Sequence, residues 1–215
     1  MGPKKDKTKD LLLEAGRRHV INSGLSEGLD DVKLTNVLKE VDLSTGAAYN
    51  IWENQDEYRR ELSLYIAENF EWADTSTVLA AIASLPEHST MDDWVQAVAD
   101  TYFPLFVANM DFFIVLRFWG VKEPTPELTE AVRAGYELTH QGFCHLYTQA
   151  FEHYGLQVVA PCTLDDITAM VTACLEGFAL RYRFQPERVT DDNGRLLFTQ
   201  VLRTVVDNHL EPADS

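Results

Sequence analysis

The sequence predicts an all-α protein. Apolar residues recur at spacings of three and four along most of the 215 residues, which places them on one face of successive helices. The sequence contains no strand–helix alternation, no hairpin turn signal and no internal repeat. Capping residues and prolines separate the helical segments. We expect a three-helix domain over residues 1–54, followed by a larger helical domain over residues 55–215.

The segment from Leu34 to Trp52 contains two short helices joined by a tight corner. Apolar residues at 34, 37, 38 and 41 line one face of the first helix, and that face must be buried. Asp42 lies at the corner, where a residue that tolerates a left-handed backbone is needed. Ser44 then offers a short hydroxyl that caps a second helix beginning at Thr45.

The second helix has the composition of a surface that approaches another molecule closely. Gly46, Ala47 and Ala48 are small and leave the helix backbone accessible. Tyr49 and Asn50 follow with a phenol and an amide, which reach phosphate oxygens or base edges in a major groove. The segment therefore predicts a helix-turn-helix that reads DNA. Taken alone, two buried core helices would show the same pattern.

The surrounding sequence favours the DNA-binding interpretation. Residues 8–23 form a third amphipathic helix, and the stretch from Gly24 to Asp31 is loop-like. In this order of elements, and in the line LSTGAAYNIW from Leu43 to Trp52, the chain resembles the TetR family of bacterial transcriptional repressors. The family line is roughly apolar, Ser, any, Gly, Thr, Leu, Tyr, any, His, Phe. The resemblance continues from Asn54 to Tyr58, where the family opens a long fourth helix.

Four positions depart from the family pattern. Asp42 replaces the usual Gly at the corner, and Ala47 replaces a Thr. Ile51 replaces a His, and Gln55 replaces a Lys that commonly touches a phosphate. The residues that we expect to bind DNA are Lys33, Thr35, Ser44, Thr45, Gly46, Ala47, Tyr49, Asn50 and Gln55.

The formal charge of −16 opposes DNA binding, because attraction to phosphates supplies most non-specific affinity. The charge is unevenly distributed, since residues 1–60 hold ten Lys and Arg against eleven Asp and Glu, and residues 61–215 hold eight against 23. The acidic residues thus lie mainly outside the predicted DNA-binding segment. Lysines at 4, 5, 7 and 9 form a basic arm that either lies along phosphates or remains a solvated terminus.

The composition also indicates the compartment. No run of eighteen apolar residues occurs, and the N-terminus is not a basic segment leading into an apolar one. We therefore expect neither a membrane span nor a secretory signal, and a cytoplasmic protein. Cys144, Cys162 and Cys174 are an odd number of cysteines in apolar surroundings, which predicts reduced thiols and no disulfide.

Five further helices are expected before residue 155. Residues 55–73 form one long helix that links the two domains, and residues 75–85 form a shorter Ala-rich helix. Thr90 caps a helix from Met91 to about Ala108, which Pro104 is expected to kink. Residues 111–119 are nearly all apolar and must be enclosed, and residues 127–154 form a long amphipathic helix.

Residues 163–184 and 196–210 are two more apolar helices, separated by a polar loop that predicts an antiparallel hairpin. The resemblance to the TetR family extends here, because its last two helices pair with their copies in a twofold-related subunit. It implies a homodimer through residues 163–184 and 194–210, bound to a palindromic operator in double-stranded DNA. Core packing within one chain is the alternative.

Large aromatic residues crowd the helices between residues 91 and 154. Rings of this size are hard to pack without voids, and voids between helices are where small ligands bind. The resemblance implies an inducer pocket here, for a small and mostly apolar molecule that releases the repressor from DNA. Plain core packing is the alternative for most of these rings. The residues that we expect to bind the ligand are Trp94, Tyr102, Phe106, Phe113, Arg117, Trp119, Tyr136, His140 and Phe143.

The sequence offers one candidate set of metal ligands and no catalytic motif. Glu137, His140 and Cys144 share a helical face in the manner of zinc or copper ligands, but such spacing often arises by chance, so no metal or cofactor is predicted. The sequence lacks the phosphate-loop, nucleophile-elbow, zinc-protease and dinucleotide motifs. We expect a DNA-binding regulator, not an enzyme. A small helical enzyme or a ligand-binding protein without DNA function is the alternative.

Overall fold

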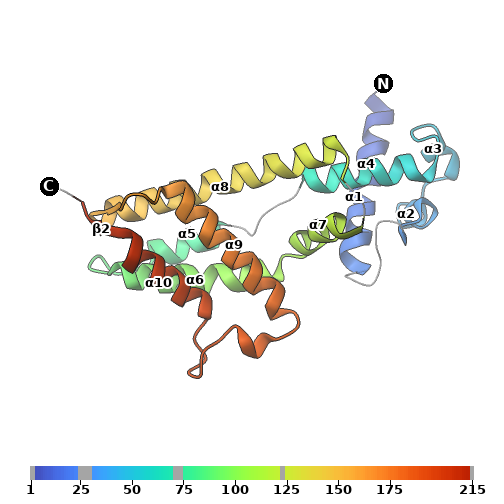
Figure 1. Ribbon diagram of the computed structural model, residues 1–215. Coiled ribbons are helices and arrows are strands. Elements are labelled where there is room, and N and C mark those ends of the chain that lie inside the picture. Colours follow the sequence, from blue (N-terminus) through green and yellow to red (C-terminus); the bar gives the residue numbers. More distant parts are fainter. Residues whose placement is uncertain (1–2, 24–30, 70–74, 122–123, 214–215) are drawn as a thin grey trace. The chain divides into compact units, whose positions relative to one another are not determined.

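The computed structural model describes residues 3–23, 31–69, 75–121 and 124–213, of which the side chains of residues 3–5, 75 and 117–121 are not considered (Figure 1). Helices dominate these residues, which confirms the all-α fold class. The chain divides into two compact units. One comprises Met1–Glu71 and Met110–Gly135, and the other comprises Trp72–Asn109 and Tyr136–Ser215.

The first unit is built around the predicted helix-turn-helix. Its elements are α1 (Pro3–Ser23), α2 (Leu34–Glu40), α3 (Thr45–Tyr49), α4 (Gln55–Glu68), α7 (Met110–Val121) and the start of α8 (Pro126–Tyr154). The core side chains come from all three helices of the predicted DNA-binding domain and from α4 and α7. Its most deeply buried members include Leu12, Val37, Trp52, Leu62 and Ile114.

The second unit surrounds α6 (Met91–Ala108), which contacts α8 through aromatic rings and packs closely against three further helices. These are α5 (Thr75–Ala83), α9 (Leu164–Tyr182) and α10 (Leu197–His209). Phe103 of α6 contacts Tyr182 of α9 and Phe198 of α10 through its ring, at centroid distances of 5.9 and 6.2 Å. The short 3-10 helix η2 (Pro186–Arg188) lies between α9 and α10. The predicted helix over residues 196–210 is confirmed to within one residue at each end.

Side-chain caps mark the starts of three helices, as their sequences indicate. Asn54 accepts a hydrogen bond from the backbone N–H of Glu57, at 2.9 Å. Thr90 and Thr163 each form a capping box with the Asp three residues later, which satisfies two backbone donors at once. Helix α6 therefore begins at the residue that the sequence predicts.

Among the described residues, the helix boundaries differ from the predictions mainly at the start of α1. Helix α1 begins at Pro3, five residues before the expected start, so the basic arm is part of this helix. Lys9 forms an ion pair with Glu61 of α4, at 2.9 Å, which is not compatible with an entirely solvated arm. Helix α8 runs without interruption through Gly135 and Gly142. The predicted loop over residues 24–30 and the end of the predicted helix over residues 70–73 lie outside the described residues.

A two-stranded antiparallel ribbon was not predicted from the sequence. Strand β1 (Leu156–Val158) pairs with β2 (Leu210–Pro212), so the end of α8 is joined to the end of α10 (Figure 1). Gly155, with a φ of 62°, ends α8 and redirects the chain into β1. Each strand has only three residues, which is too short for a detectable alternation of apolar and polar side chains.

Among the described residues, no single helix has the length and apolarity needed to cross a membrane. Only the broken pair Met91–Ala108 and Met110–Leu116 meets that requirement together, by length and composition.

Candidate functional site

The corner between α2 and α3 has the backbone that the sequence predicts. Asp42 has a φ of 51°, which is the left-handed conformation. The backbone N–H of Leu43 donates to the carbonyl of Leu38, at 3.0 Å, and closes the turn. The Asp in place of the family Gly is therefore compatible with the tight corner of a helix-turn-helix.

One face of α3 is fixed in the core. Ala48 is completely buried, and the Trp52 side chain just after the helix is 1% exposed. The Trp52 indole N–H donates to Glu61 of α4, at 2.6 Å, and its ring meets the edge of Tyr58 at a centroid distance of 4.9 Å. Because these contacts hold the back of this short helix, its outer face has a fixed position on the head, the three-helix segment made of α1, α2 and α3.

The outer face of α3 consists of polar and small side chains. Thr45, Gly46 and Asn50 are exposed, and Tyr49 is 61% exposed although it is a large ring. Ala47 is half-buried. An exposed Tyr next to an exposed amide, on a helix with a fixed back, has the donors and acceptors that contact phosphates and base edges.

Ser44 occupies the predicted N-cap position but does not cap the helix with its side chain. Its carbonyl instead accepts from the backbone N–H of Ala47, at 3.0 Å. The expected hydroxyl cap is therefore wrong. The backbone closes the first turn, and Ser44 is left on the exposed surface beside Thr45.

Gln55 has a structural role that its sequence position did not reveal. Its carbonyl oxygen accepts from the backbone N–H of Leu34, at 2.8 Å, and its amide donates to the carbonyl of Val32, at 3.0 Å. These two bonds hold the start of α2 against the start of α4. Lys33 and Thr35, which flank this point, are exposed.

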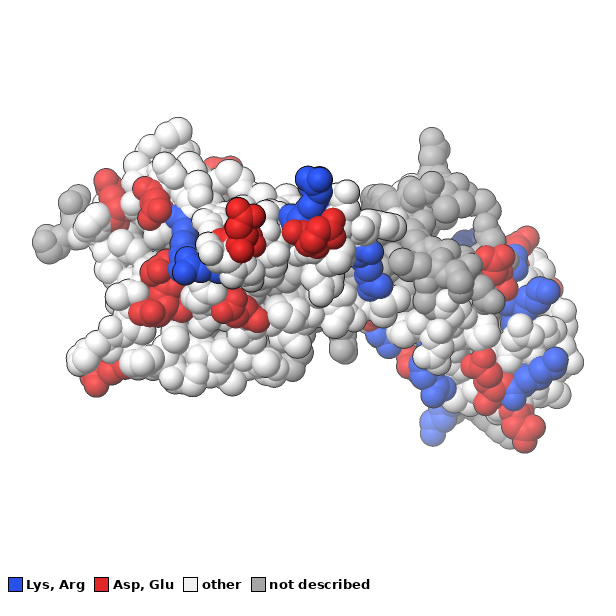
Figure 2. All heavy atoms as spheres, turned by 90° about the horizontal axis from the view of Figure 1, so that it is seen from below, with Lys and Arg blue, Asp and Glu red and all other residues white. Residues whose placement is uncertain are grey.

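The distribution of charge agrees with the uneven pattern in the sequence. On the face drawn in Figure 2, basic and acidic side chains intermingle over the unit that contains the head, whereas acidic side chains outnumber basic ones over the other unit. The intermingled charges reduce the repulsion that a phosphate backbone would meet at the head.

The family model of the BetI-type transcriptional repressor C-terminal domain, TetR_C_6, matches residues 91–211, more than half of the chain. The chain belongs to the TetR family of transcriptional regulators. The match to the family model thus comes from the C-terminal half of the chain. The resemblance at residues 43–58 is a separate observation in the N-terminal part. No curated protein matches the chain significantly in sequence.

Solved structures of TetR-family proteins have the same fold. A TetR-family transcriptional regulator from Agrobacterium tumefaciens superposes with a TM-score of 0.56 at 12% identity, over 96% of this chain and 100% of that one. A proposed transcriptional regulator from Pseudomonas aeruginosa PAO1 gives a TM-score of 0.55 at 18% identity, over 96% and 91%. At these identities the similarity concerns the fold, including an N-terminal DNA-binding domain and a larger helical domain.

The second unit of this TetR-family chain contains a connected set of aromatic rings from α6 and α8. Tyr102 meets the edge of Phe143 at 5.2 Å and stacks on Phe106 at 6.0 Å. Phe143 stacks on Tyr147, which also meets the edge of Trp94 at 6.1 Å. The structure thus brings four predicted ligand-binding residues together, and it adds Tyr147, which is not among the residues predicted to bind the ligand.

The Tyr102 hydroxyl is a polar group enclosed by this set of rings. Tyr102 is 2% exposed, and no described residue forms a hydrogen bond with its hydroxyl. Burial raises the pKa of this hydroxyl, so it stays protonated at neutral pH and is able to donate. A buried donor without a protein acceptor costs free energy unless a bound molecule accepts from it.

The remaining predicted ligand-binding residues lie elsewhere. Tyr136 is 38% exposed, and His140 lies near Asp165 of α9, at 3.3 Å. Phe113 is buried in the first unit. Arg117 and Trp119 belong to α7 of that unit, and their side chains are outside the described part of the chain.

Proposed function

We propose that this TetR-family chain is a homodimeric repressor that reads a palindromic operator through α3 and leaves DNA when a small, mostly apolar inducer binds. The observation that carries the proposal is the exposed face of Thr45, Tyr49 and Asn50 on a helix anchored by buried Ala48 and Trp52. Acting on DNA, the protein works in the cytoplasm. Residues 1–54 form its DNA-binding part, and residues 55–215 bind the inducer and dimerise.

Base recognition is assigned to α3, with positioning by residues around it. Thr45, Tyr49 and Asn50 face the major groove, and Lys33, Thr35 and Ser44 contact phosphates on either side. Small Gly46 and Ala47 allow close approach. Gln55 acts through the backbone of α2, because its amide holds the carbonyl of Val32 and the N–H of Leu34.

Dimerisation is supported by an apolar stripe on α9. Met170 and Leu180 are 40% and 41% exposed, and Phe184, just after the helix, is 82% exposed. Ala173 and Gly177 lie between them at spacings of three and four and are also exposed, so the five positions form one face. Exposed apolar side chains that form a continuous patch mark an interaction surface. A twofold axis through this face would pair each stripe with its copy.

Inducer binding is supported by the rings around Tyr102. They provide an apolar environment in which the buried Tyr102 hydroxyl has no acceptor among the described residues, which is typical of a site for a mostly apolar molecule with one acceptor group. An inducer acts only through its different affinity for the two states of the protein. Coupling of about 1–3 kcal/mol, roughly 5- to 150-fold, is enough for a regulatory response.

Footprinting tests the proposal directly. The purified full-length protein is titrated against fragments of the DNA that flanks its own coding sequence, first at low and then at increasing salt. We expect one protected inverted repeat, with affinity that falls steeply with salt because phosphate contacts release counterions. Equal binding to all fragments at every salt concentration would contradict sequence-specific regulation. A reporter assay then distinguishes repression from activation.

A further inference from the structure

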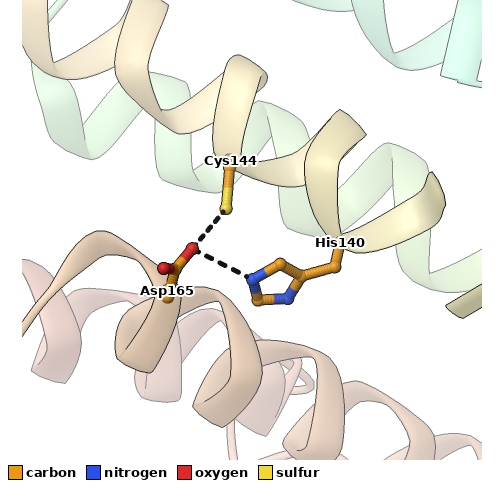
Figure 3. Close-up of side chains that lie close together, drawn as sticks. All are labelled: His140, Cys144 and Asp165. Atoms are coloured by element: carbon orange, nitrogen blue, oxygen red, sulfur yellow. Dashed lines mark hydrogen bonds and ion pairs between the residues drawn. The ribbon is translucent and has the colours of Figure 1, made fainter. Parts of the chain in front are cut away.

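Three side chains of different chemistry meet where α8 packs against the start of α9 (Figure 3). His140 and Cys144 lie one turn apart on α8, and Asp165 lies in the first turn of α9. One ligand atom from each residue lies within 4.8 Å of the other two. The sequence spacing had joined His140 and Cys144 to Glu137, but it gave no indication of Asp165, which is 21 residues beyond Cys144.

Asp165 is held at this point by the cap of its own helix. The Thr163 side chain accepts from the backbone N–H of Asp166, at 3.1 Å, and the Asp166 carboxylate accepts from the backbone N–H of Thr163, at 2.9 Å. This capping box fixes the first turn, so the carboxylate of Asp165 is presented to α8 by ordered backbone. The geometry of the three side chains therefore does not depend on a loop.

Two of the three separations between the ligand atoms are those of neighbouring ligands around one ion. His140 Nε2 lies 3.3 Å from Asp165 Oδ1, and Cys144 Sγ lies 3.6 Å from the same oxygen. Zinc binds nitrogen and oxygen at about 2.1 Å and sulfur at about 2.3 Å. In a tetrahedron these bond lengths separate nitrogen from oxygen by about 3.4 Å and sulfur from oxygen by about 3.6 Å. An ion would therefore fit with only small side-chain movements.

We propose that His140 Nε2, Cys144 Sγ and Asp165 Oδ1 bind a divalent zinc ion, with the fourth position open to water. Imidazole, thiolate and carboxylate together suit zinc better than magnesium or calcium, which prefer all-oxygen sites. His140 and Cys144 are half-buried and Asp165 is exposed, so the ion has access from solvent. Glu137 lies close enough to act on the Cys144 thiol electrostatically and adds negative potential.

Binding releases the thiol proton of Cys144 to solvent, because the thiolate is the ligand. Without the ion, the Cys144 thiol interacts with Asp165 and with the hydroxyl of Thr168, at 3.3 Å. The proton balance requires affinity for zinc to rise with pH. The zinc site does not involve the residues proposed to bind DNA. A failure of the zinc proposal would therefore leave the proposed repressor function untouched, and the reverse also holds.

Cobalt provides a visible probe of the same site. The tag-free, reduced full-length protein is titrated with Co²⁺ and its absorption recorded, and Zn²⁺ is then added as competitor. We expect tetrahedral d–d bands, a sulfur-to-cobalt charge-transfer band and their loss on adding zinc. Cys144→Ser should abolish the charge-transfer band. His140→Gln and Asp165→Asn should weaken binding by at least about 10- to 100-fold, the loss that changes to outer-shell partners already cause.

Matched variants distinguish this site from adventitious binding. His145→Gln changes an exposed His next to Cys144, and Cys162→Ser removes another free thiol, and both should bind as wild type does. Circular dichroism verifies that every variant is folded. If the charge-transfer band survives Cys144→Ser, or if the folded wild-type protein shows no such band, the three residues are a hydrogen-bonded cluster and the zinc site is wrong.

Discussion

Arg17 of α1 donates a hydrogen bond to the carboxylate of Asp111 in α7, 94 residues away in the sequence. Asp111 is 6% exposed, which makes this a largely buried ion pair inside the first unit. Next to it, Ile114 of α7 is part of the core that Leu12, Trp52 and Leu62 form. Helix α7 is therefore a structural part of the first unit, although it follows α6 of the second unit after a single residue.

Asp111→Asn should destabilise the first unit, because it removes the buried carboxylate that accepts from the Arg17 guanidinium and leaves Arg17 with the longer ion pair to Glu14. We expect a loss of about 1.5–3 kcal/mol in the free energy of unfolding, as for hydrogen bonds to charged groups. Urea unfolding of the variant and of wild type measures this loss of stability. In a double-mutant cycle, Arg17→Met should cost little once Asp111 has been replaced. Additive effects of the two changes would show that the pair does not contribute as a pair.

Gly16→Ala should destabilise the head by overpacking. A Cβ at this position would lie 2.2 Å from the Tyr58 hydroxyl and 3.0 Å from Leu62, and both side chains are fully buried. Overpacked cores lose about 1–3 kcal/mol of stability. Gly142→Ala, on open α8 surface, is the matched control and should instead gain about 0.5–1 kcal/mol. Equal thermal shifts for both variants would contradict the close packing of α1 on α4.

Asn50→Ala should relax base preference at one position in each operator half-site. If its exposed amide binds a base through two hydrogen bonds, the loss is about 1–3 kcal/mol of affinity for the preferred base. Binding to a panel of single-base operator variants measures this. Asn193→Ala, an exposed Asn outside the head, serves as control. A uniform loss across all operator variants would indicate a phosphate contact instead.

Leu180→Glu should break the proposed dimer without unfolding the chain. The side chain is 41% exposed, so the monomer tolerates a charge there, whereas a twofold interface would bury that charge unpaired. Light scattering at micromolar concentration should give a dimer for wild type and a monomer for the variant. Leu79→Glu changes a similarly exposed Leu of α5 and should remain dimeric. A monomeric wild-type protein would be incompatible with the proposal.

The contribution of Glu176 of α9 to the free energy of unfolding should be larger in mild acid than at neutral pH. Burial raises the pKa of its carboxyl above 4.5, although a hydrogen bond from Tyr136 of α8 opposes the shift. The folded state thus holds this proton to higher pH than the unfolded state does. Stability falls as pH rises from about 4.5 through the raised pKa, and the loss persists at neutral pH.

Glu176→Gln removes that dependence. The variant should be more stable than wild type at neutral pH, and its advantage should shrink as pH falls toward the ordinary pKa of a Glu, about 4.3. Urea midpoints across this range provide the measurement. Glu187→Gln, in exposed η2, controls for the general effect of removing one negative charge. A pH-independent difference between Glu176→Gln and wild type would show that the carboxyl is not perturbed.

Local signals in the sequence predicted most of the helices and the corner. Thr90 marks a helix start through capping, and Asp42 marks the turn, because each effect needs only neighbouring residues. The core face of α2 also follows from spacing alone. These features account for the fold class and for the exposed face of α3.

Features that depend on distant partners could not be predicted in this way. Gln55 looks like a phosphate ligand in the sequence, yet its amide is bound to the backbone at residues 32 and 34. Asp165 joins His140 and Cys144 only because two helices pack together. The spacing within one helix identifies side chains on a common face, but it does not identify what the neighbouring helix presents to them.

The order of the two compact units along the chain affects how the protein is synthesised. Because the core of the first unit includes Ile114 and its ion pair includes Asp111, the nascent chain must extend past α7 before the DNA-reading head is complete. Helices α5 and α6 of the other unit leave the ribosome earlier. A chimeric regulator built by transplanting residues 1–54 alone would therefore lack the buried core side chains of Tyr58, Leu62, Ile66 and Ile114 and the Asp111 carboxylate that Arg17 binds, so it would need α4 and α7 as well.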